Sequence, residues 1–195
     1  MKTQLMTDNE LVVQFVNGDA QAIETLIHRY KNKVYTYILL TVRDQQLAED
    51  IFQDTFLKVI KSLTEGRYQE NGRFLQWVMR IAHNLVIDYY RREKQMNTVS
   101  SEKYEFDLFN SQKFSDQTIE DEIIDFQINK DIRRLVDELP DDQKEIILLR
   151  HYGGLSFKEI ADQTNVSINT ALGRMRYALI NLRKIIKDNN ISLTK

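Results

Sequence analysis

The sequence predicts an all-α protein: two small helical domains joined by a flexible acidic linker, the C-terminal one containing a helix-turn-helix. The 195 residues include one proline and six glycines, too few for the turns of a strand-rich sandwich or barrel. Apolar residues recur at helical spacing behind residue types that cap helices. This periodicity lapses between residues 94 and 117, where the chain is polar and acidic, as in a linker.

Residues 1–95 are predicted to form the first domain from four amphipathic helices. Thr7 and Glu10 have the spacing of a capping box that opens the first helix. Asp19 and Asp44 can cap the second and third helices. The inward face of the third helix is expected to comprise Ala48, Ile51, Phe52, Thr55, Phe56 and Val59.

The opposite face of the third helix carries acidic and amide side chains with one exposed apolar residue. These residues are Asp50, Gln53, Asp54 and Leu57. The two aspartates are four positions apart and share a face, but no histidine or third acid accompanies them there. A protein-docking surface is therefore the preferred interpretation, and no metal site is predicted.

A loop is expected at residues 62–72, with Asn71 starting the fourth helix. Its apolar stripe is predicted to comprise Phe74, Trp77, Val78, Ile81, Ala82, Leu85, Val86 and Tyr89. Its outward side would comprise Arg73, Gln76, Arg80, His83, Asn84, Asp88, Arg91 and Arg92. Arginines along one face can follow a phosphate backbone, although an ordinary solvated face is the alternative.

Aromatic residues near that loop have two possible roles. Phe74 and Trp77 lie on the apolar stripe, so packing is their default role, but aromatic side chains at a domain edge can also stack on an unpaired base. Arg67, Tyr68 and Asn71 combine a cation, an aromatic ring and an amide, a mixture suited to holding a flipped base.

The acidic linker is placed at residues 96–117 and the second domain at residues 118–195. Pro140 is predicted to begin a new helix, because the first helical position needs no N–H donor. Two helices separated by a short break are predicted further on. The first begins with a capping box at Ser156 and Glu159, and the second is capped by Ser167 and runs through Arg183. A short helix, a break of about four residues and a second helix rich in small polar and basic residues are typical of a helix-turn-helix.

The final helix is expected to pack through Ala171, Met175, Ala178, Leu179 and Leu182. Its candidate DNA-contacting residues are Ser167, Asn169, Thr170, Gly173, Arg174 and Tyr177. Arginine can contact a guanine edge and asparagine an adenine edge. A glycine in mid-helix costs about 1 kcal/mol relative to alanine, which a close approach to DNA would explain. The alternative is a solvated basic helix with an accidental glycine.

Charge distribution supports anion binding although the net charge is −2. Residues 150–187 hold seven Lys and Arg against two Asp and Glu, and residues 67–94 hold six against three. The chain lacks cysteine, and it has neither an apolar run long enough for a membrane span nor a secretory signal pattern. Its three histidines are scattered, and no catalytic constellation, P-loop or dinucleotide fingerprint is present. A cytoplasmic, non-enzymatic protein without cofactors is expected.

Three segments together resemble the extracytoplasmic-function group of sigma factors, a branch of the primary sigma factor family of bacterial RNA polymerase. Residues 48–57 (AEDIFQDTFL) look like its polymerase-clamp-binding motif, and residues 74–92 (FLQWVMRIAHNLVIDYYRR) are similar to its segment that melts and reads the minus-ten element. Residues 139–140, 155–161 and 166–167 resemble its domain that binds the minus-thirty-five element.

The resemblance implies a function for each domain. Residues 1–95 would be a sigma region 2 like domain, binding the clamp through Asp50, Gln53, Asp54 and Leu57. The same domain would bind the minus-ten element through Arg67, Tyr68, Asn71, Phe74, Trp77, Arg80, Asn84 and Arg91. Residues 118–195 would be a region 4 like domain on the minus-thirty-five element, although Leu172 and Tyr177 stand where the family often has Lys and Arg.

The implied partners are core RNA polymerase, double-stranded promoter DNA upstream, the single-stranded non-template strand and an anti-sigma factor, without membrane insertion. Two other functions remain open from the residues alone. One is a stand-alone helix-turn-helix transcriptional regulator, and the other is a sigma-like adaptor that sequesters a partner.

Overall fold

The computed structural model describes residues 6–69, 71–97 and 135–189, and every regular element within these ranges is a helix. The predicted all-α class is thereby confirmed. The chain divides into two compact units, one comprising Met1–Ser100 with His151–Leu155 and the other Ser101–Arg150 with Ser156–Lys195. The acidic linker predicted at residues 96–117 lies almost entirely outside the described residues, so its bounds stay a prediction.

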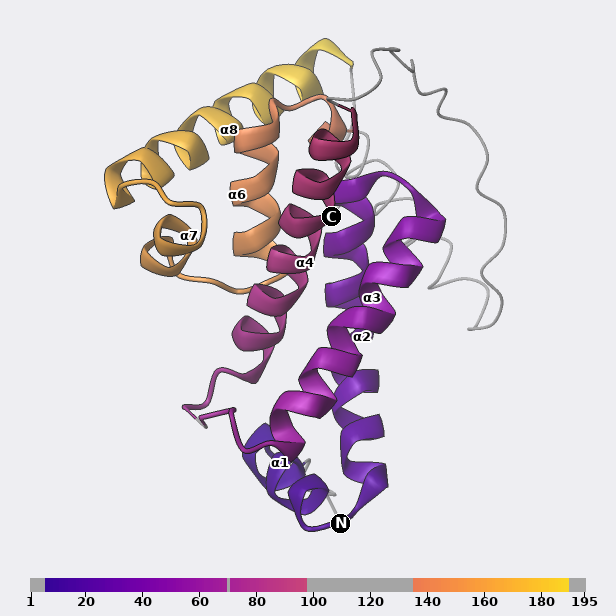
Figure 1. Cartoon of the computed structure of the whole chain (residues 1–195). Coiled ribbons are helices and arrows are strands. Elements are labelled where there is room, and N and C mark those ends of the chain that lie inside the picture. The colour runs from indigo at the N-terminus through magenta and orange to yellow at the C-terminus, as the bar shows by residue number, and fades with distance from the viewer. Residues whose placement is uncertain (1–5, 70, 98–134, 190–195) are drawn as a thin grey trace, which may run out of the picture. The chain divides into compact units, whose positions relative to one another are not determined.

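Four helices build the first unit: α1 (Asp8–Val16), α2 (Ala20–Val42), α3 (Gln45–Thr64) and α4 (Phe74–Asn97), as Figure 1 shows. The predicted caps are confirmed. Thr7 and Glu10 form a reciprocal capping box, Asp19 accepts a hydrogen bond from the backbone N–H of Gln21, and Asp44 accepts one from that of Leu47. Each cap satisfies a backbone donor that the first helical turn leaves unpaired.

The core of the first unit lies where α2 packs against α1, α3 and α4. Its apolar side chains come from all four helices, and they include Leu11, Leu26, Val34, Ile38, Ala48, Val59, Phe74, Val78 and Ala82. An ion-paired cluster adds to the α1–α2 contact, since Asp8 accepts hydrogen bonds from the Arg29 guanidinium and, at 2.5 Å, from the Tyr30 hydroxyl. The outward faces of α3 and α4 are thus held on a packed support.

The predicted connection between α3 and α4 needs two corrections. Helix α3 continues through Thr64, two residues past the expected start of the loop, and α4 begins at Phe74 rather than at Asn71. Gly72 explains the later start. Its φ of +71° is left-handed, a conformation that cannot continue a right-handed helix.

The buried face of α4 is also rotated from the predicted stripe. Leu75, Met79 and His83 are buried in addition to Phe74, Val78, Ala82 and Val86, whereas Tyr89 is 36% exposed. His83 was placed on the outward side, and that expectation was wrong. Its ring Nδ1 lies 2.9 Å from the Tyr37 hydroxyl of α2, and this hydrogen bond allows a polar ring to lie in the core.

The second unit contains α6 (Asp141–His151), α7 (Phe157–Gln163) and α8 (Ile168–Asp188), and residues 135–137 before α6 are also helical. Helix α6 begins directly after Pro140, whose carbonyl accepts from the backbone N–H of Lys144 at 2.9 Å. The predicted capping box at Ser156 and Glu159 is confirmed. Ser167 caps α8 as predicted, although that helix extends five residues past Arg183.

The turn between α7 and α8 makes the helix-turn-helix geometry. Asn165 takes a left-handed φ of 53°, which asparagine tolerates better than most residues. Ala161 and Ala171 are buried where the two helices cross, while Leu172 is 44% exposed. Sequence reasoning left open whether Ala171 or Leu172 packs at this crossing, and the structure places Ala171 there.

Candidate nucleic-acid interface

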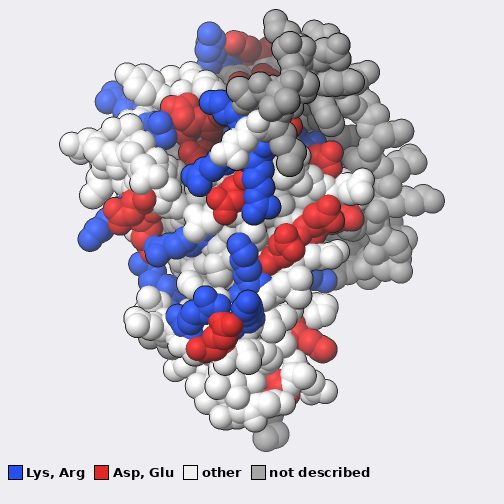
Figure 2. Space-filling model, viewed as in Figure 1, with Lys and Arg blue, Asp and Glu red and all other residues white. Residues whose placement is uncertain are grey.

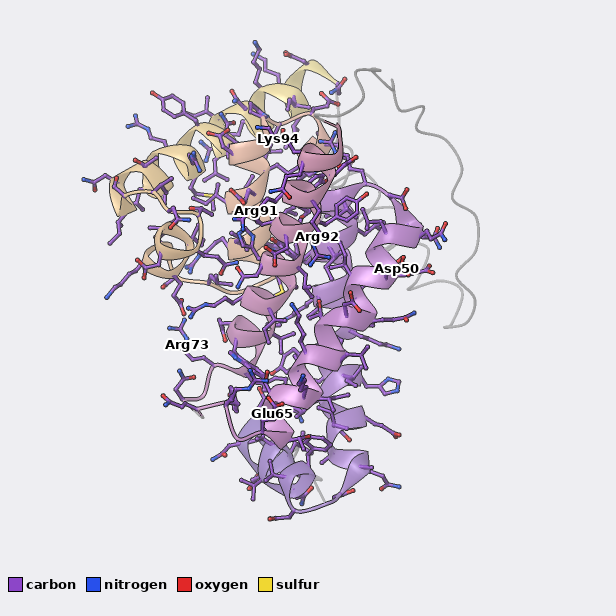
Figure 3. All side chains as sticks on the ribbon, viewed as in Figure 1. Asp50, Glu65, Arg73, Arg91, Arg92 and Lys94 are labelled. Carbon is purple, nitrogen blue, oxygen red and sulfur yellow. The ribbon has the colours of Figure 1, made fainter. Side chains whose placement is uncertain are left out.

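The outer face of α4 presents polar and basic side chains. Arg80, Asn84 and Arg91 are exposed and lie at i, i+4 and i+11, positions that share one side of a helix. Arg91 makes a long ion pair with Asp88, at 3.7 Å, and its side chain is 69% exposed. Figure 3 labels Arg91, Arg92 and Lys94 along the C-terminal half of this helix. These side chains are placed to contact an anionic strand.

An aromatic cluster lies at the start of α4. The Tyr68 and Trp77 ring centroids are 4.5 Å apart, and the Phe74 centroid lies 5.7 Å from each. Phe74 is fully buried, so in this conformation it supports the other two rings from the core and has no surface for a ligand. Tyr68 and Trp77 are half-buried and retain some accessible surface.

The connection before α4 carries the remaining residues predicted there. Arg67 pairs with Glu65 on the surface, and Asn71 is exposed. Glu65 and Arg73, labelled in Figure 3, lie near the two ends of this connection. The structure therefore brings Tyr68, Phe74 and Trp77 together, while Arg67 and Asn71 lie in the adjoining loop.

Two hydrogen bonds from α4 to α2 fix the position of this face. Burial lowers the pKa of His83 to about 4, so its ring is neutral at pH 7 and can pair with the Tyr37 hydroxyl. Further along α4, the Tyr90 hydroxyl donates to the Thr41 carbonyl at 3.2 Å. Sequence reasoning missed both anchors, because neither partner lies near in the chain.

The outer face of α3 forms a second surface. Asp50, Gln53 and Asp54 are exposed, and Leu57 has 63% of its surface exposed. Figure 3 labels Asp50 on this helix. Within the described residues, no group of three or more His, Asp or Glu side chains is arranged to hold a metal ion. An exposed leucine beside carboxylates is a pattern suited to protein docking.

The N-terminal half of α8 presents the third surface. Asn169 and Thr170 are exposed, and Tyr177 is 62% exposed. The Ser167 hydroxyl accepts from the backbone N–H of Thr170 at 3.0 Å, so its capping role uses part of its hydrogen-bonding capacity. A Cβ placed on Gly173 would meet nothing within 4 Å. No contact within the described residues therefore requires a glycine there.

Arg174 differs from the other predicted DNA-contacting residues of α8 because it forms an ion pair with a residue of α6. Its Nε lies 3.3 Å from an Asp142 carboxylate oxygen, and its side chain is 27% exposed. Burial raises the pKa of the neighbouring Glu145, while the Arg174 charge opposes that rise. Arg176, which sequence reasoning missed, is exposed instead. It lies seven positions after Asn169, a spacing that could have identified it.

Charges of both signs occur close together on the surface. In the view of Figure 2, blue Lys and Arg side chains lie beside red Asp and Glu side chains. No helix within the described residues is both long and apolar enough to cross a membrane.

Comparison with protein families now adds to this geometry. Residues 26–96 match the family described as sigma-70 region 2, and residues 129–177 match the family described as sigma-70, region 4. These ranges contain α3, α4 and α7 with the first half of α8, which carry the three surfaces. Two such regions in this order on one helical chain define a sigma factor.

Curated relatives agree with this class, and a solved structure shares the fold. The chain is 27% identical over 180 residues to the ECF RNA polymerase sigma factor SigW of Bacillus subtilis, covering 91% of this chain and 95% of that one. It is 26% identical to the RNA polymerase sigma-H factor of Pseudomonas aeruginosa, over 86% and 88% of the two chains. The fold resembles that of the sigma factor RpoE of Bartonella quintana, solved with the anti-sigma factor NepR, at a TM-score of 0.62, 18% identity and coverage of 84% and 96%.

The chain belongs to the sigma-70 family of sigma factors, and the relatives that it resembles include ECF sigma factors.

Proposed function

We propose that this chain is an alternative sigma factor that binds core RNA polymerase, recognises promoter DNA and initiates transcription in the bacterial cytoplasm. The observation that carries the proposal is that both matched regions expose polar and apolar side chains to solvent on the outer faces of their helices. On α3 these include Leu57, and on α8 they include Asn169 and Thr170. The proposed role is one of binding and positioning, without catalysis by this chain.

The polymerase-docking surface is assigned to Asp50, Gln53, Asp54 and Leu57. Their side chains point away from a helix whose other face, including Ala48 and Val59, is fully buried. Leu57 would enter an apolar pocket of the partner, and the carboxylates would meet cations around it. A few well-packed residues of this kind carry most of the free energy of an interface.

The minus-ten element is assigned to the start and outer face of α4. Arg80, Asn84 and Arg91 would contact the backbone and base edges of the separated non-template strand. Tyr68 and Trp77 would stack on an unpaired base, with Arg67 and Asn71 beside it. Phe74 would support these two rings without contacting DNA, because it is fully buried and its ring packs against both of them.

The minus-thirty-five element is assigned to the N-terminal half of α8. In a helix-turn-helix, the N-terminal residues of the second helix contact base edges in the major groove. Asn169 and Thr170 fit this role by position and exposure, Ser167 and Tyr177 can reach phosphates, and Gly173 would permit close approach. Arg174 would have to exchange Asp142 for DNA, since the two are ion-paired.

An anti-sigma factor completes the proposed set of partners. The Bartonella quintana sigma factor was solved in complex with such an inhibitor. This part of the proposal rests on relatedness, and no surface of this chain is assigned to it.

Transcription in vitro from a pool of genomic promoters tests the proposal. Purified bacterial core polymerase would be supplied with and without the full-length chain, and new transcript starts would be mapped. Discrete starts that align on two upstream elements are expected. Stable core binding without starts would instead support a sequestering adaptor, and tight DNA binding without core binding would support a stand-alone regulator.

A further inference from the structure

Leu172 lies in the middle of a row of outward-facing side chains on α8, the second helix of the helix-turn-helix. Asn169, Leu172, Gly173 and Arg176 are at i, i+3, i+4 and i+7, so they share one side of α8. Asn169 and Arg176 are exposed, and Leu172 retains 44% of its surface. An aliphatic side chain therefore projects between an amide and a guanidinium group.

Leu172 does not fill the crossing of α7 and α8. The crossing of α7 and α8 is filled by Ala161 and Ala171, which are 2% and 0% exposed. The cation nearest in sequence, Arg174, is turned toward Asp142 of α6. The N-terminal half of α8 thus presents Leu172, with the exposed Ile168 one turn before it, beside the polar Asn169 and Arg176.

We propose that Leu172 is a specificity-determining residue that contacts the C5-methyl group of a thymine in the major groove of the upstream promoter element. This inference rests on the proposed function. The occupant is duplex DNA because the same row carries Asn169, which can pair with an adenine edge, and Arg176, which complements phosphate or guanine.

The chemistry of the groove selects thymine. Among the major-groove edges of the four bases, the thymine methyl is the apolar group, and the remaining groups are donors and acceptors. Leucine can satisfy none of those polar groups. A guanine or cytosine edge opposite Leu172 would lose water without gaining a hydrogen bond, so the leucine disfavours G·C while its contact with the methyl favours thymine.

Replacing thymine by uracil removes only that methyl group and so isolates the contact. Holoenzyme reconstituted from core polymerase and the full chain would be titrated with a promoter found in the transcription experiment. Each thymine of the upstream element, on both strands, would be changed singly to deoxyuridine. Wild type is expected to lose roughly fourfold in affinity at one position, the value of one buried methyl group.

Two variants identify the side chain responsible. Leu172→Ala should bind the thymine and uracil promoters with equal affinity. Leu179→Ala is the matched control. The expectation that Leu179 packs inward was wrong, because it is 45% exposed, and it lies on the same helix two turns further from the N-terminus. This control should keep the wild-type preference for thymine.

Two results would overturn the inference: no uracil substitution weakens wild type, or Leu172→Ala keeps the same preference. An upstream element without thymine at a fixed position would also overturn it. In each of these cases the mapped starts would still support the sigma factor function, so the two proposals fail separately.

Discussion

Acid should destabilise the first unit through His83. The histidine is 4% exposed and hydrogen-bonded to Tyr37, and burial lowers its pKa from 6.5 to about 4. Between these two values the unfolded chain binds a proton that the folded chain does not, so stability falls as pH falls through this window. The contribution is fully present above about pH 6.5.

The size of the effect follows from this difference in pKa. One pH unit within the window is worth about 1.4 kcal/mol, so lowering the pH from 7 to 5 should remove about 2 kcal/mol from the free energy of unfolding. Urea unfolding can measure this loss through the fluorescence of Trp77, which is the single tryptophan of the chain and lies in the same unit.

The control is His83→Gln, whose amide can still hydrogen-bond the Tyr37 hydroxyl but does not titrate. The variant should lose much less stability than wild type over the same pH interval. Glu10, whose pKa is lowered by its hydrogen bonds to Thr7, loses its contribution only at lower pH. Equal losses in wild type and variant would refute the assignment of acid sensitivity to His83.

Three further substitutions test the surfaces. Leu57→Arg should weaken core polymerase binding at least about tenfold, while the free energy of unfolding stays within about 0.5 kcal/mol of wild type. The control Val13→Arg, at a site 51% exposed on α1, should bind core polymerase normally. Wild-type affinity of Leu57→Arg in titrations would rule out α3 as the docking face. Gly173→Ala should stabilise α8 by about 1 kcal/mol yet weaken holoenzyme binding to the upstream element, and unchanged promoter affinity would contradict a close approach to DNA. Asp142→Asn should cost at most about 1 kcal/mol, because its ion pair with Arg174 is partly exposed. It should also steepen the salt dependence of DNA binding by about one phosphate contact, and an unchanged slope would mean that Arg174 does not reach the DNA.

Local signals explain why so much of the fold could be predicted from the sequence. A capping residue and the apolar pattern behind it lie within a few positions of each other, so Thr7, Asp19, Asp44, Ser156 and Ser167 identified helix starts correctly. The helix-turn-helix followed from two of these caps. None of these predictions needed a contact distant in sequence.

The errors arose where a residue distant in sequence determines the structure. His83 occurs in a polar stretch of α4, and its hydrogen-bond partner Tyr37 lies 46 positions earlier in the chain. The ion pair of Arg174 with Asp142 was not predicted for the same reason, because it depends on how α6 and α8 pack; the assignment of Arg174 to DNA stays a prediction. The start of α4 was missed for a backbone reason, because the left-handed φ of Gly72 cannot be read from residue type alone.

The ion pair between Arg174 and Asp142 bears on how such a protein would search a genome. A chromosome offers about 10⁶–10⁹ competing sites whose phosphates attract any unpaired cation equally. A guanidinium already matched within its own domain gains less from phosphate at each of those sites. The pair thus lowers affinity for phosphate at every site, so the fit of side chains to the bases contributes a larger share of the discrimination between a promoter and other DNA.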